Sequence, residues 1–149
     1  MLKTVVIGIG NPLRGDDGVG WAVIEALEAE SGAPITAVSA HQLLPEHIDL
    51  FRLEAQVIFV DASVEGTAGE VTVTAVPATK DGPAASHHLH PGVLLALGEK
   101  LYGRMPPAHL ITISGQAFGY EEKLSLPARE AIAIVVNQIK QLAVVPTSP

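Results

Sequence analysis

The sequence predicts a single α/β domain whose mostly parallel, twisted sheet is covered by helices on both sides. Two observations support this fold class. Short β-branched and apolar runs, typical of strands buried on both faces, alternate along the chain with amphipathic helical patterns. The chain also has 149 residues, which is the length of one domain and enough to bury a hydrophobic core without disulfide bonds.

The first strand and helix are predicted from a β-branched run followed by a helical pattern. Residues 5–10 are apolar and lead into a Gly-Asn-Pro turn. Apolar residues then recur at helical spacing over 16–30, and the Gly-Ala-Pro sequence at 32–34 ends this pattern. A short loop therefore joins the strand to the helix.

The next elements continue the alternation of strand and helix. Residues 35–40 alternate as a strand, and residues 45–53 have the pattern of a short helix. Residues 57–60 repeat the buried-strand pattern, which ends at Asp61. Folds of this class bind ligands beyond the carboxyl ends of their strands, so we expect the Asp61 carboxylate at that edge.

The second half of the chain contributes two more strands and two more helices. Val and Thr alternate over 69–76, which fits an edge strand with one wet face. A helix begins near Val93 and ends at Gly103, and residues 110–113 form the last strand. Ser125 is placed to cap a final helix with five apolar residues on one face: Ile132, Val135, Val136, Ile139 and Leu142. The domain is expected to span 1–145, followed by a disordered tail over 146–149.

The composition excludes several classes of function. The chain has 9 Lys and Arg against 16 Asp and Glu, so its net charge of -7 argues against a nucleic-acid partner. It has no cysteine, which excludes disulfide bonds, thiolate zinc sites and cysteine nucleophiles. Neither a signal peptide nor a membrane span is visible, so the expected compartment is the cytoplasm and no membrane partner is expected.

The glycine-rich loop after the first strand does not fit a phosphate site. A dinucleotide fingerprint needs glycine where Leu13 stands, and Pro12 lacks an amide donor. The glycine spacing resembles a P-loop, but Asp16 and Asp17 stand where that loop has Lys and Ser or Thr. The loop is therefore expected to repel phosphate and attract cations. Helix capping is the alternative role for these two acids, although one cap does not need both.

Histidines supply the remaining candidate ligands. His87, His88 and His90 cluster ahead of a predicted helix, whereas three others stand apart and are assigned to the surface or to ordinary packing: His41, His47 and His109. Two carboxylates and one histidine would suit zinc or nickel better than calcium or magnesium.

Three segments together resemble the [NiFe]-hydrogenase maturation endopeptidases. They are GIGNPLRGDDGVG at 8–20, FVDA at 59–62, and Ser-His at 86–87 ahead of Leu-Ala-Leu at 95–97. The opening segment with its paired acids is the most specific of the three. The resemblance covers nearly the whole chain and implies a five-stranded, three-layer α/β/α domain. It also implies an endopeptidase that removes a short C-terminal extension from the hydrogenase large-subunit precursor after nickel insertion.

The same resemblance implies the site residues and the partner. The metal ligands would be Asp17, Asp61 and His87, with both carboxylates as the catalytic groups. Counting back from residues 95–97 favours His87, and the adjacent His88 is the alternative ligand. The implied metal is the nickel of the precursor, for which zinc or cadmium can substitute. The implied partner is that precursor, and we expect the enzyme to be a monomer.

Two mechanisms are compatible with this site. A metal beside the scissile peptide would polarise its carbonyl group and lower the pKa of a water molecule. Alternatively, the carboxylates would activate the water while nickel only positions the peptide. Two other function classes stay open: a non-catalytic nickel-binding maturation chaperone, and a metal-dependent hydrolase of small molecules.

Overall fold

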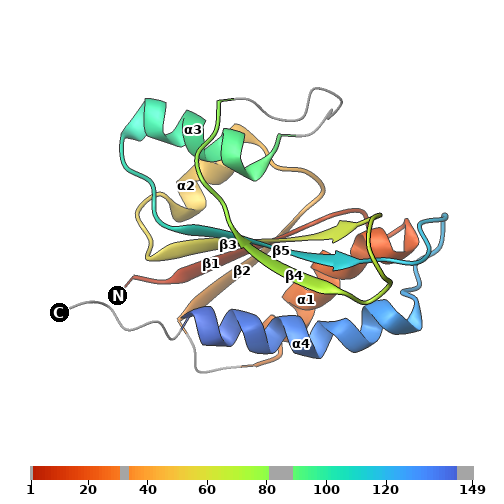
Figure 1. Ribbon diagram of the computed structural model, residues 1–149. Helices are drawn as coiled ribbons and strands as arrows, with labels where there is room; N and C mark the ends of the chain where they lie inside the picture. The colour runs from red at the N-terminus through yellow and green to blue at the C-terminus, as the bar shows by residue number, and fades with distance from the viewer. Residues whose placement is uncertain (1, 31–33, 81–88, 144–149) are drawn as a thin grey trace.

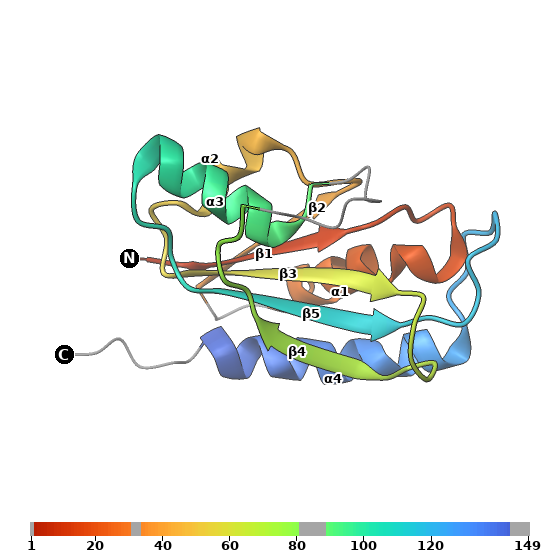
Figure 2. The same cartoon turned by 45° about the horizontal axis from the view of Figure 1, so that its top comes forward.

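The predicted α/β fold class is confirmed. The structure, a computed structural model, describes residues 2–30, 34–80 and 89–143. Within these residues five strands form one sheet in the order β2-β1-β3-β5-β4. All neighbouring strands are parallel except β4, which runs antiparallel to β5 (Figure 2). The strands are β1 (Thr4–Ile9), β2 (Ile35–Ala40), β3 (Gln56–Ser63), β4 (Val71–Ala75) and β5 (Ala108–Ser114).

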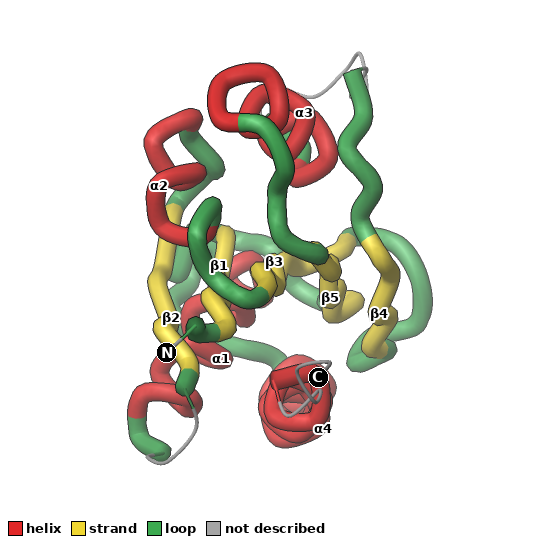
Figure 3. Tube along the Cα trace, turned by 90° about the vertical axis from the view of Figure 1, so that its left-hand side faces the viewer, coloured by secondary structure: helices red, strands yellow, loops and turns green. Residues whose placement is uncertain are grey.

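Helices cover both faces of the sheet and give three layers (Figures 1 and 3). On one face lie α1 (Val19–Glu28) and α4 (Leu126–Ala143); on the other lie α2 (Ile48–Phe51) and α3 (Pro91–Tyr102). Each face has its own apolar core. The side chains of β3 show the division, because Ile58 and Val60 join the core under α1 and α4 whereas Val57 and Phe59 join the other.

The strand order creates a switch point between β1 and β3. From β1 the chain crosses through α1 to β2 on one side, and then returns past β1 to β3 on its other side. In open α/β sheets such a reversal leaves a crevice beyond the carboxyl ends of the two central strands. The loop after β1 carries Asp16 and Asp17, and the end of β3 carries Asp61, so the topology brings these acids to one edge.

Two element boundaries differ from the prediction. A 3₁₀ helix, η1 (Gly15–Gly18), precedes α1, so the acids at 16 and 17 lie ahead of the α-helix and outside its first turn. Strand β3 does not end at residue 60. It continues through Asp61 because residues 61–63 pair with residues 112–114 of β5, a partner that local sequence does not reveal.

The edge strand β4 is correctly placed, but the prediction that only one of its two faces is exposed to solvent is wrong. Only Val71 packs partly against the core, and the remaining four residues are exposed, including Val73 at 36%. The strand therefore forms the edge of the sheet and contributes little to the core.

The helix ends follow the signals in the sequence. Ser125 caps α4, since its Oγ accepts a hydrogen bond from the Ala128 amide at 3.4 Å. Pro91 is the first residue of α3, and Gly103 ends that helix with a φ of 88°. The predicted short helix at 45–53 is a 3₁₀ turn, η2 (Pro45–His47), followed by α2. No helix among the described residues is long and apolar enough to cross a bilayer. The predicted tail at 146–149 lies outside the described residues.

Candidate metal centre

A cavity opens at the switch point between β1 and β3. Its volume is about 260 Å³, and both Asp17 and Asp61 line it. The other polar side chains in its wall belong to His41, Gln42 and His90. The structure thus brings together the two predicted carboxylates, which are 44 positions apart in the sequence.

Asp61 lies in a desolvated position on β3. By strand alternation it shares the face of Val57 and Phe59, under α2 and α3. Burial raises the pKa of its carboxyl group to about 7; a hydrogen bond from the Ala62 amide, 2.8 Å long, acts in the opposite direction, and the charge of Asp17 raises the pKa further. A buried carboxylate beside a second acid is a position that a cation would stabilise.

Asp17 is oriented by the loop that follows β1. Its Oδ2 accepts a hydrogen bond from the Asn11 amide at 2.8 Å, and Oδ1 accepts none from a described residue. The loop can wrap this closely because residue 10 is glycine. Gly10 has a φ of 149°, and a Cβ built there would lie 1.9 Å from the carbonyl oxygen of Asp17. One carboxylate oxygen is therefore held by the protein and the other is left for a ligand.

Asp16 has a different role from its neighbour, and neither acid caps α1. The Asp16 side chain is fully buried and accepts four hydrogen bonds from the loop between β5 and α4. The donors are the Gln116 amide (2.7 Å), the Ala117 amide (3.1 Å), and both the amide and the hydroxyl of Ser125 (2.7 Å each). Burial alone would raise the pKa of Asp16, but these hydrogen bonds outweigh it and hold the pKa below its usual value.

Further contacts tie the same two loops together. The Gly15 amide donates to the Glu121 carbonyl at 2.7 Å, and the Glu121 amide donates to the Leu13 carbonyl at 3.0 Å. The Arg14 guanidinium lies 4.8 Å from the ring centroid of Tyr120. The loop that carries Asp17 is thus held in place by a segment that lies about 100 residues further along the sequence.

The predicted histidine ligand is not tested. His87 and its alternative His88 lie outside the described residues. Within the described ranges no group of three or more His, Asp or Glu side chains is arranged to hold a metal ion. The described part of the centre therefore consists of two carboxylates.

His41 is the site residue that the sequence analysis missed. It was assigned to the surface or to packing, and it is indeed exposed, but it also lines the cavity. Its ring packs on Trp21, with centroids 4.9 Å apart. The available signal was its position directly after β2, at the same sheet edge as Asp17. His47 accepts a hydrogen bond from the Leu44 amide, which fits its assignment to ordinary packing.

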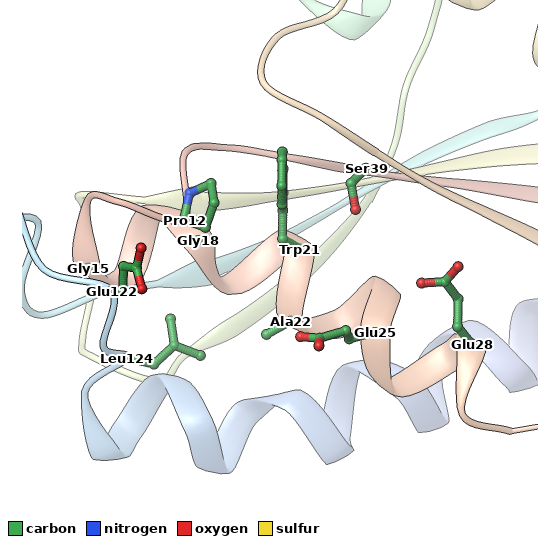
Figure 4. A pocket seen from close by; sticks show the side chains of 10 residues that line it. All are labelled: Pro12, Gly15, Gly18, Trp21, Ala22, Glu25, Glu28, Ser39, Glu122 and Leu124. Atoms are coloured by element: carbon green, nitrogen blue, oxygen red, sulfur yellow. The ribbon is translucent and has the colours of Figure 1, made fainter.

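Trp21 also borders a second cavity, shown in Figure 4. Its indole stands on α1 between Pro12 and Ser39, and its Nε1 donates to the Ala40 carbonyl at 3.0 Å. Neither Asp17 nor Asp61 lines this second cavity. Trp21 therefore holds the end of β2 through its hydrogen bond and packs against the ring of His41.

Comparison with known proteins finds this fold among solved structures. No protein-family model matches the sequence, and no curated protein matches it at a significant level. Among solved structures, the E. coli hydrogenase maturating endopeptidase HybD has a TM-score of 0.80 at 19% identity, covering 95% of this chain and 91% of that one. The [NiFe] hydrogenase maturation protease HycI from Thermococcus kodakarensis KOD1 has a TM-score of 0.76 at 24% identity, with coverages of 95% and 92%.

A third structure covers a slightly larger share of both chains. The hydrogenase 2 maturation peptidase from a Thaumarchaeota archaeon has a TM-score of 0.70 at 20% identity, covering 97% of this chain and 99% of that one. The chain thus has the fold of these proteins over nearly its whole length.

The buried carboxylate of Asp16 generates a stability prediction. Asp16→Asn replaces an acceptor of four hydrogen bonds by an amide whose NH₂ group opposes the donors, and we expect a loss of about 3 kcal/mol at pH 7. Because the folded-state pKa is lowered, the contribution of Asp16 is complete above about pH 4 and is lost as the pH falls through the folded value. Urea unfolding measures both effects.

The matched control for this prediction is Asp49→Asn. Asp49 makes only an exposed ion pair with Arg52 at 3.2 Å, so its loss should cost less than about 0.5 kcal/mol. Equal stability of the two variants would show that Asp16 is not the brace described above.

Asp61 generates a prediction of the opposite sign. The folded protein keeps the Asp61 proton up to about pH 7, whereas the unfolded chain loses it near pH 4. The contribution of this group to stability therefore falls as the pH rises from about 4 to about 7, by a few kcal/mol. Asp61→Asn should stabilise the metal-free protein at pH 8 and change it little at pH 4, as measured by urea unfolding with a chelator present. An equal gain in stability at both pH values would show that the raised pKa of Asp61 is not the cause.

Proposed function

We propose that this chain is an endopeptidase that removes the C-terminal extension of a nickel-loaded [NiFe]-hydrogenase large-subunit precursor. The observation that carries the proposal is the pair Asp17 and Asp61, gathered in one cavity at the switch point of the sheet. The fold supports it, because solved structures named as hydrogenase maturation proteases share that fold.

The donor chemistry of the cavity fits a divalent cation. Asp17 leaves one carboxylate oxygen without a hydrogen bond from a described residue, and the Asp61 carboxylate is both desolvated and close to a like charge. A divalent ion between them would offset the desolvation and the repulsion together. With His87 as a third ligand the set would suit nickel, zinc or cadmium. The nickel is part of the substrate in this proposal, so cleavage would depend on completed metal insertion.

No side chain is proposed as the nucleophile, so the reaction needs a water molecule to attack the scissile peptide bond. In one route a carboxylate of the pair takes a proton as water attacks the scissile carbonyl carbon, and the proton then passes to the leaving amine as the C–N bond breaks. In the other route Asp17 and Asp61 would hold a metal ion, which would supply polarisation of the carbonyl and activation of the water. In both routes the scissile peptide bond of the substrate must lie next to Asp17 and Asp61.

Cleavage of a purified precursor tests the proposal directly. The wild-type chain should cleave the nickel-loaded precursor and leave the metal-free precursor largely intact. Asp17→Asn and Asp61→Asn should each lower the rate of cleavage by about 100-fold or more, because each removes a charged oxygen needed for proton transfer or metal binding. Mass spectrometry of the large subunit follows the loss of the extension.

The other outcomes of this experiment identify the competing functions. Binding of the nickel-loaded precursor without cleavage would indicate a maturation chaperone. Neither binding nor cleavage would leave a metal-dependent hydrolase of small molecules. Rapid cleavage of the metal-free precursor would show that nickel is not the trigger.

The histidine ligand is tested by two adjacent variants. Neighbouring residues of an extended segment point to opposite sides, so we expect only one of His87 and His88 to serve the site. His87→Ala should lose nickel affinity and precursor cleavage together, whereas His88→Ala should keep most of both. Nickel titration and cleavage are measured on the two variants side by side. The reverse ranking would move the ligand to His88, and equally mild effects would remove histidine from the site.

A further inference from the structure

His90 occupies a special position at the start of α3. It is the N-cap residue, with extended backbone angles (φ -74°, ψ 143°), and Pro91 follows as the first helical residue. Its Nδ1 accepts a hydrogen bond from the amide of Gly92 at 3.0 Å. An imidazole thus fills the N-cap role that Ser, Asp or Asn usually has at the start of a helix.

This cap determines which ring nitrogen carries the proton. A nitrogen that accepts a hydrogen bond must be unprotonated, so the proton of the neutral ring is on Nε2. A histidine that binds a metal shows the opposite arrangement: one nitrogen offers its lone pair to the ion and the other donates its N–H. At His90 the Nδ1 lone pair is already used by the Gly92 amide, and Nε2 has no lone pair to offer.

His90 is also one of the residues that line the cavity that holds Asp17 and Asp61. It is half-buried there, and its Nε2 makes no hydrogen bond to another described residue. In their ionised form the two carboxylates of the cavity only accept hydrogen bonds and offer nothing to a carbonyl oxygen. A peptide entering the cavity presents such oxygens along its backbone, and the Nε2–H group is a donor able to meet one.

We propose that His90 is a fixed hydrogen-bond donor of this cavity, binding a carbonyl oxygen of the substrate peptide through Nε2–H, and that it is not a metal ligand. The proposal rests on the proposed protease function for the identity of the substrate. It assigns separate roles to two nearby histidines of one segment, since His87 is the proposed metal ligand.

Cap-competent substitutions separate this role from helix capping. In His90→Ser the hydroxyl still accepts from the amides of the first turn, so the melting temperature should stay close to that of the wild type, while the Nε2–H donor is lost. We expect kcat/KM for the nickel-loaded precursor to fall about 3- to 10-fold, the range for one hydrogen bond to a neutral acceptor. His90→Asn, another good cap, serves as a second variant should the serine variant lose stability.

His47→Ser is the matched control. His47 also accepts a backbone hydrogen bond at a helix start, from the Leu44 amide at 2.8 Å, but it does not line the cavity. Its replacement should leave kcat/KM unchanged. Equal kcat/KM values for His47→Ser, His90→Ser and the wild type would overturn the substrate-binding role.

Two measurements test the donor assignment without any cleavage. Long-range ¹H–¹⁵N correlation spectra, assigned by comparison with His90→Ser, should show Nδ1 unprotonated and Nε2 protonated. Titration with Ni²⁺ alone should give the same affinity for His90→Ser as for the wild type, within about twofold. A protonated Nδ1, or a tenfold loss of Ni²⁺ affinity in His90→Ser, would make His90 a ligand instead. If the wild type does not cleave the precursor, the proposed function fails, and these two readouts still decide whether His90 is a donor or a ligand.

Discussion

The position of Asp17 depends on one buried carboxylate, that of the preceding residue Asp16. Asp16 gathers four hydrogen bonds from the loop before α4 and from the residue that caps that helix. Because Asp17 is the next residue, the same bonds fix where its side chain begins. The donors also keep the pKa of Asp16 low, so that the brace stays charged well into the acid range. The loop after β1 is thereby tied to the segment that precedes α4.

The acids of this region differ because their surroundings differ. Asp16 is buried among donors, which lower its pKa, whereas Asp61 is desolvated, has one amide donor among the described residues and lies near a like charge, so its pKa is raised. The first arrangement stabilises the folded chain, and the second destabilises it at neutral pH until a proton or a cation arrives. Unfavourable electrostatics of this kind are common at functional sites, where a ligand completes the charge balance.

The sequence was sufficient where the determining interactions are local. The buried β-branched runs, Ser125 as a cap and Gly103 as a helix end all act within a few residues, and each was predicted correctly. It was insufficient where the partner is distant. Strand β3 extends past Asp61 because of pairing with β5, and Asp16 serves a segment about 100 residues away instead of its own helix. The role of His41 was missed for the same reason, since the cavity that it lines exists only after the sheet has formed.

The topology also separates the two carboxylates of the cavity from the histidines that line it. Asp61 stands on the central strand β3, and Asp17 lies in η1, in the connection that follows the central strand β1; neighbouring strands hold both strands on both sides. His41 and His90 approach the same cavity from outside this centre, one after β2 and the other at the start of α3. Under the proposed function, a substitution at these outer positions would alter which peptide binds without moving the acids, because neither residue is part of the strand pairing that places them. Under the proposed function, the strand-held centre would therefore constrain the reaction, while the surrounding helix starts and loop ends would be free to differ between substrates.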